Sequence, residues 1–86
     1  MNLKDIPSEN QWRIDLKNTR IEVTAYHQIA SGFEKLSNLP ENAKSRSVYF
    51  SKFTNFKRSA FSCEQFLNSL IKFGKAHGYT EEKIGQ

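Results

Sequence analysis

Cysteine, proline and glycine are scarce in this chain of 86 residues, which contains one Cys, two Pro and four Gly. A single cysteine, Cys63, cannot form a disulfide within the chain, so nothing indicates an oxidising compartment. No apolar run approaches the roughly 18 residues that a membrane-spanning helix needs. The polar residues from Met1 to Gln11 also lack the apolar segment of a secretory signal. We therefore expect a soluble, cytoplasmic protein that has no contact with a membrane.

Groups that carry catalysis or bind metals are equally few. Zinc takes about four ligands, and apart from carboxylates the chain offers only Cys63, His27 and His77. The scattered glycines form no phosphate-binding loop. At the start of a helix, Cys63 could become a reactive thiolate, but on the apolar face of that helix a small inert thiol is the commoner explanation. We predict no catalytic residue, no metal site, no cofactor and no enzymatic activity.

Acidic residues are absent from residues 42–63, although the chain contains nine. The segment carries five positive charges and the remainder one net negative charge, which together give the formal net charge of +4. It also contains five of the eleven aromatic residues, which are Tyr49, Phe50, Phe53, Phe56 and Phe61. Basic side chains interleaved with aromatic rings suit nucleic acid, which has charged phosphates and flat bases. The alternative is a core strand with solvated flanks.

The first half of the chain shows the alternation of a β-hairpin. Apolar and polar residues alternate from Trp12 to Lys17 and again from Ile21 to Ala25. A period of two predicts strands, so we expect a hairpin over about 12–26 and a short helix over about 28–37. Helical spacing of the apolar residues competes with this interpretation over residues 21–27. The β-branched side chains there favour a strand, and the choice between strand and helix stays open.

The second half predicts another hairpin and a longer helix. Strand-forming residues are dense over about 47–61. Ser62 and Gln65 match a capping box, which predicts an amphipathic helix over about 63–77, and Gly78 is suited to its end. The expected fold class is therefore α+β, a small antiparallel sheet packed by two helices. We expect residues 1–11 to be a loosely ordered leader and residues 12–86 to form one compact domain.

In this fold the basic hairpin presents its side chains to one anionic target. The predicted binding residues are Lys44, Arg46, Tyr49, Lys52, Phe53, Lys57 and Arg58. The favoured function is a small nucleic-acid-binding module, with the type of nucleic acid left open. The alternative is a protein-interaction module, an inhibitor or a regulatory adaptor, that docks on an acidic partner protein. Exposed aromatic residues in so small a domain also suit a homodimer.

Overall fold

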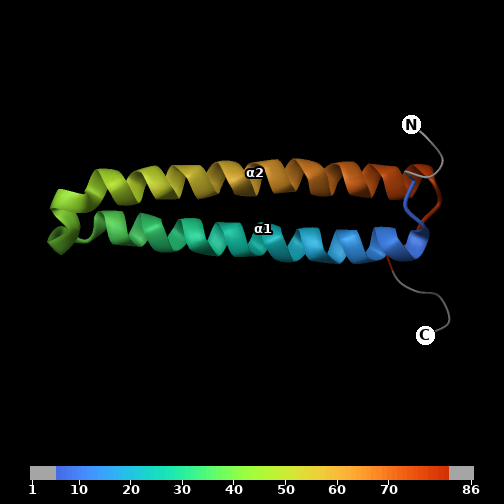
Figure 1. Ribbon diagram of the computed structural model, residues 1–86, viewed down its shortest axis with the longest axis horizontal. Coiled ribbons are helices and arrows are strands. Elements are labelled where there is room, and N and C mark those ends of the chain that lie inside the picture. The colour runs from blue at the N-terminus through green and yellow to red at the C-terminus, as the bar shows by residue number, and fades with distance from the viewer. Residues whose placement is uncertain (1–5, 82–86) are drawn as a thin grey trace.

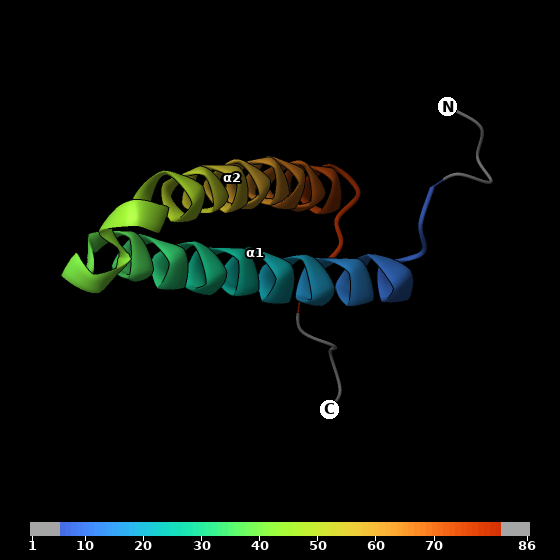
Figure 2. The same cartoon turned by 60° about the vertical axis from the view of Figure 1, so that its left-hand side comes forward.

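Two long helices joined by a short turn make up the structure, a computed structural model that describes residues 6–81. Helix α1 spans Glu9–Asn38, the 3-10 helix η2 spans Pro40–Ser45, and helix α2 spans Arg46–Ala76. The two α-helices run antiparallel and side by side along their length (Figures 1 and 2). At 1.5 Å per residue each is about 45 Å long. The described residues thus form a helical hairpin that is a single layer thick.

The predicted α+β fold is wrong, because the described residues contain no strand. The hairpin expected over 12–26 and the helix expected over 28–37 are parts of α1. The hairpin expected over 47–61 lies within α2, as does most of the helix expected over 63–77. The division into a leader and a domain stays a prediction. Part of that leader lies outside the described residues, and α1 begins at Glu9, within its predicted range.

A seam of inward-facing side chains joins the two helices. Along each helix these residues are spaced alternately four and three positions apart, which is the seven-residue repeat that keeps one face of a helix on its partner. Helix α1 contributes Trp12, Leu16, Thr19, Val23, Tyr26, Ala30, Phe33 and Ser37, and α2 contributes Tyr49, Phe53, Phe56, Ala60, Cys63, Leu67, Leu70 and Gly74. All of them are buried or half-buried. We call this set the seam.

Trp12 sets the register of the hairpin at its open end. Its side chain is 2% exposed, and Nε1 donates a hydrogen bond of 2.7 Å to the carbonyl oxygen of Leu70. The indole fits against α2 because residue 74 is glycine. A Cβ atom there would lie 2.6 Å from Cε2 and 2.8 Å from Cη2 of Trp12. The largest side chain of α1 therefore meets the smallest residue of α2.

Nearer the loop, aromatic rings interdigitate across the seam. Phe56 of α2 stacks on Phe33 of α1 with ring centroids 5.7 Å apart, and it also lies 6.2 Å from the ring of Tyr26. Ala30 and Ala60, both 0% exposed, occupy the adjacent seam positions. Alternating large and small residues in this way lets the two helices approach without voids or overlap.

The misleading alternation in α1 comes from two apolar stripes on one helix. Leu16 and Val23 belong to the seam, whereas Ile14 is 49% exposed and Ile21 is 57% exposed on the outer side. In sequence the two stripes interleave and imitate the period of a strand. The β-branched residues are tolerated because packing along the seam overrides their weak intrinsic preference.

Hydrogen bonds close the helix ends. Ser8 is the N-cap of α1, and its side chain accepts a 3.1 Å hydrogen bond from the backbone N–H of Gln11. At the loop, Arg46 Nε donates to the carbonyl oxygen of Ser37 at 3.0 Å. The end of α2 is confirmed where the sequence placed it, with Gly78 at a φ of 71°.

Neither described helix is apolar enough over a sufficient length to cross a membrane.

Candidate binding surface

Winding residues 46–76 into one helix separates the predicted binding residues. Tyr49 and Phe53 lie in the seam, where the ring of Tyr49 stacks on that of Phe33 with centroids 6.3 Å apart. The Nζ atom of Lys52 lies 5.9 Å from the centroid of that same Phe33 ring. Lys57 and Arg58 project about 140° and 120° away from Lys52, because each residue turns a helix by about 100°. Lys52 therefore does not share a face with them.

A different subset does share one face of α2. Arg46, Phe50, Lys57 and Phe61 follow one another at intervals of four, seven and four residues, which keeps them on one side of a helix. Phe50 is 56% exposed and Phe61 is 60% exposed, and the basic side chains are exposed as well. Arg58 lies at the edge of this face. We call Arg46, Phe50, Lys57, Arg58 and Phe61 the cationic stripe.

Three members of the cationic stripe were predicted and two were missed. Arg46, Lys57 and Arg58 were predicted as binding residues, whereas Phe50 and Phe61 were counted only as aromatic residues of the segment. The signal that identifies them is their helical spacing relative to Arg46 and Lys57, which has meaning only once the segment is known to be a helix.

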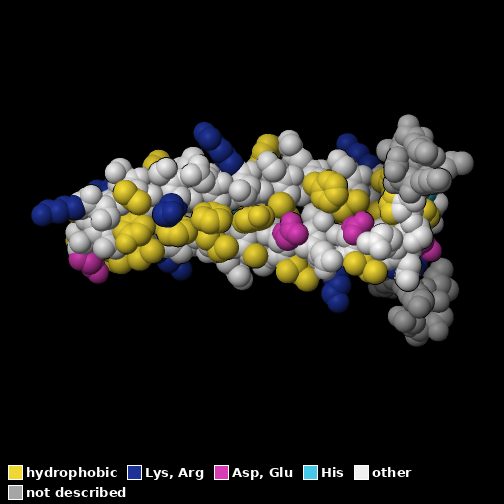
Figure 3. Space-filling model, viewed as in Figure 1, with side chains coloured by type: hydrophobic (Ala, Val, Ile, Leu, Met, Phe, Trp, Pro, Cys, Tyr) yellow, Lys and Arg dark blue, Asp and Glu magenta, His cyan; other side chains and the backbone are white. Residues whose placement is uncertain are grey.

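The net positive charge of the molecule lies in its loop half, residues 31–58. That range contains six basic and two acidic residues, a net charge of +4. Ion pairs between described residues are confined to three, which join Arg13 to Glu9, Arg20 to Glu81 and His27 to Glu64. None of them involves the cationic stripe. Figure 3 shows Lys and Arg side chains projecting from both edges of the molecule, with hydrophobic side chains gathered along the seam between them.

A surface depression lies where the cationic stripe meets the loop. Lys44, Arg46 and Phe50 line it together with residues from the end of α1 and from η2. The hydrogen bond from Arg46 Nε to the Ser37 carbonyl oxygen orients the guanidinium group at this edge. Lys44 and Arg46 line the same depression, so the two side chains can present positive charge to a single carboxylate or phosphate group.

The prediction that Cys63 begins a helix is wrong, because the residue lies in the middle of α2. Its Sγ atom lies 3.7 Å from Oε2 of Glu22 on α1. Burial, and then the neighbouring Glu22 carboxylate, raise the pKa of the thiol above its ordinary value of 9.0. The neutral thiol is favoured at neutral pH, so this position does not generate a reactive thiolate.

Among residues 6–81, the remaining titratable groups form no recognisable reaction centre. His27 pairs with Glu64 across the two helices, and no third titratable group is bonded to this pair among the described residues. In the same part of the chain, no group of three His, Cys, Asp or Glu side chains is arranged to hold a metal ion. The cationic stripe is therefore the candidate functional surface.

Comparisons with protein-family models, with curated proteins and with solved structures find no match for this chain.

Proposed function

We propose that this protein is a non-enzymatic interaction module whose cationic stripe binds an acidic, amphipathic segment of a partner protein. The observation that carries the proposal is the pairing of two exposed phenylalanine rings with cations on one face of α2. An apolar partner surface removes these half-exposed rings from water. Full burial of an exposed ring is worth about 1.5–3 kcal/mol, of which roughly half remains to be gained here. Acidic side chains beside that surface then meet Arg46 and Lys57.

The length of the stripe indicates a helical partner. From Arg46 to Phe61 it extends about 22 Å, or about four helical turns. Its apolar positions, Phe50 and Phe61, are three turns apart, which matches the spacing of anchor residues along a helix that packs against another helix. Nucleic acid would satisfy the charges, but only unpaired bases offer flat faces on which the two rings can stack.

A titration with a synthetic peptide tests this proposal. The probe is a fluorescent helical peptide that has leucine on one face and glutamate beside it, and its affinity is measured by anisotropy at two salt concentrations. We expect the double variant Phe50→Ala/Phe61→Ala to bind at least tenfold more weakly, because it loses the apolar contact. The matched control is Phe66→Ala, which removes a ring of 55% exposure outside the stripe.

The charged residues have a control of their own. Lys57→Ala/Arg58→Ala should weaken binding and reduce its salt dependence, whereas Lys72→Ala/Lys75→Ala removes two lysines elsewhere on α2 and should have little effect. Equal affinity of the wild type and the phenylalanine double variant for the peptide would contradict the proposal.

Nucleic acid is the second candidate partner, and one observation favours it. Residues 42–63 contain no acid, and their basic side chains form no ion pair with described residues. In this case, single- or double-stranded oligonucleotides should bind in the same titration with a steep salt dependence. Replacing Lys52, Lys57 and Arg58 by alanine should weaken that binding, whereas removing the two phenylalanines should matter less.

We also propose that the protein acts in the cytoplasm. The support is Cys63, the one cysteine of the chain, which is held as a half-buried free thiol in the seam. A reducing compartment leaves such a thiol unchanged.

A further inference from the structure

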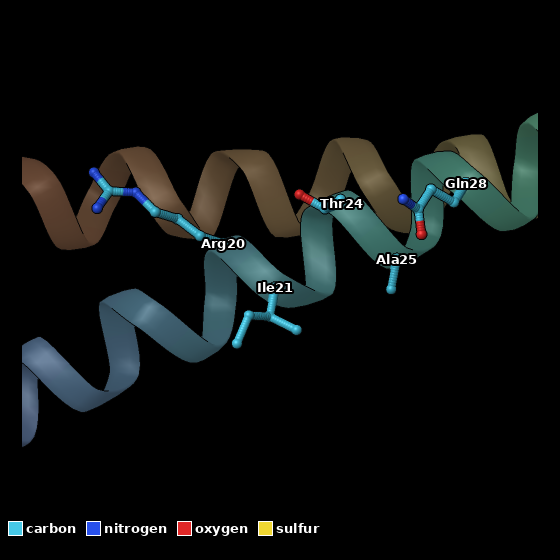
Figure 4. Close-up of a pocket in the computed structure, with 5 residues that line it drawn as sticks. All are labelled: Arg20, Ile21, Thr24, Ala25 and Gln28. Atoms are coloured by element: carbon cyan, nitrogen blue, oxygen red, sulfur yellow. The ribbon is translucent and has the colours of Figure 1, made fainter.

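Helix α1 carries a second apolar stripe on the side that does not face α2. Its large members are all exposed, with Ile14 at 49%, Ile21 at 57%, Ile29 at 42% and Leu36 at 37%. Ala25 lies at the centre of the set. Figure 4 shows the side chains of Ile21 and Ala25 projecting to one side of α1, away from the ribbon of α2. We call Ile14, Ile21, Ala25, Ile29 and Leu36 the outer stripe.

The members of the outer stripe are spaced symmetrically about Ala25 in the sequence. Four residues before and after it are Ile21 and Ile29, and eleven residues before and after it are Ile14 and Leu36. A twofold symmetric interface has this property, because residue i of one copy meets residue j of the other, and j meets i. When two copies of α1 cross antiparallel at Ala25, each isoleucine or leucine meets a residue of the same kind.

The hairpin alone encloses little apolar volume. Its buried hydrophobic residues in the described chain are Trp12, Leu16, Ala30, Ala60 and Leu70, and two of these are alanines. No large side chain there is less than 2% exposed. Two packed helices can shield only one side of each helix, and helical proteins usually enclose a core with three or more helices. A second hairpin supplies the missing cover.

From this geometry, we infer that a second copy of the chain covers the outer stripe, forming a twofold symmetric dimer through antiparallel α1 helices. Ala25 lies on the axis, where its small side chain lets the two backbones approach. A shallow surface depression lined by Arg20, Ile21, Thr24, Ala25 and Gln28 lies beside the axis and receives a partner side chain. A contact made by one helix from each copy belongs to the smaller class of interfaces, so we expect micromolar affinity.

The inference does not depend on the proposed function. The outer stripe belongs to α1 alone, whereas the cationic stripe belongs to α2, so each copy in the dimer keeps its cationic stripe exposed. The dimer therefore presents two binding surfaces, and peptide binding and dimerisation can fail separately.

Charge substitutions test both the dimer and its register. Sedimentation equilibrium at submillimolar protein should show a dimer for the wild type and a monomer for Ile21→Lys and for Ile29→Glu. The register places residue 21 beside residue 29 of the other copy, so the double variant Ile21→Lys/Ile29→Glu should recover the dimer. Val48→Lys is the matched control, because Val48 is 55% exposed on α2 and should leave the dimer intact.

A cross-linking measurement gives a readout that does not depend on the stability of charged variants. In a Cys63→Ser background, Ala25→Cys should form a disulfide between copies on mild oxidation, because the two positions meet on the axis. Asn18→Cys should not, because its two copies lie about 21 Å apart along the helices. A monomeric wild type, or equally fast cross-linking at positions 18 and 25, would overturn the inference.

Discussion

Cys63 shows how one seam position determines the chemistry of a side chain. The thiol lies against α1, and burial together with Glu22 raises its pKa above 9.0. The predicted fold placed Cys63 at the start of a helix. In the structure Cys63 is instead an unreactive side chain that packs in the seam. The sequence alone could not show this, because both causes depend on the pairing of the helices: α1 covers the thiol, and Glu22 lies 41 residues away on that helix.

The reaction of Cys63 with iodoacetamide should follow this raised pKa. The rate should rise with pH and reach its midpoint above 9.0, because only the thiolate reacts. Glu22→Gln should move the midpoint downward and accelerate alkylation near neutral pH. Part of the rise in the pKa should remain in this variant, because burial, the larger cause, is unchanged. Glu34→Gln serves as the control, and a midpoint below 9.0 in the wild type would refute the assignment.

Each α-helix has one face in the seam and a second, exposed face that carries a stripe. These two faces explain which parts of the secondary structure could be predicted from the sequence. The end of α2 at Gly78 followed from local chemistry and is confirmed. The sequence did not predict that the interior of α1 is helical. Residues of the outer stripe, such as Ile14 and Ile21, lie between the seam residues in sequence and hid the seven-residue pattern of the seam. Of the candidate site, the sequence identified the cations of the stripe through their charge. It gave Phe50 and Phe61 no binding role, because the segment was expected to be a hairpin and not a helix.

Close approach of the two helices depends on Gly74, which gives a prediction for stability. Gly74→Ala places a methyl group against Trp12, and such overpacking costs about 1–3 kcal/mol. The better helix propensity of alanine offsets about 1 kcal/mol of this. We therefore expect a lower free energy of unfolding in urea, together with a shift in the emission of Trp12.

The control for this variant is Gly32→Ala, at a helical glycine where an added Cβ meets no atom within 4 Å. In dilute solution that change should stabilise the protein by about 1 kcal/mol. If Gly74→Ala stabilised the protein as much as Gly32→Ala does, the close contact with the indole would be disproved.

At the scale of the molecule, residues 6–81 form a hairpin whose seam leaves one chemically distinct surface on each α-helix. The outer stripe of α1 is apolar and symmetric about Ala25, whereas the cationic stripe of α2 combines exposed rings with positive charge. Both exist because a single layer of two helices buries only one face of each. The proposed partner protein and the proposed second copy therefore rest on the same arrangement, the antiparallel pairing of α1 with α2.

An NMR measurement of the contact between Trp12 and Gly74 tests this arrangement most directly. The chain has one tryptophan, so its indole protons can be assigned without ambiguity. We predict nuclear Overhauser effects between the indole ring and the α protons of Gly74, and a ring-current displacement of those glycine resonances. Strand-type carbon shifts over residues 12–26, or the absence of any Overhauser effect between Trp12 and residues 70–74, would contradict the account.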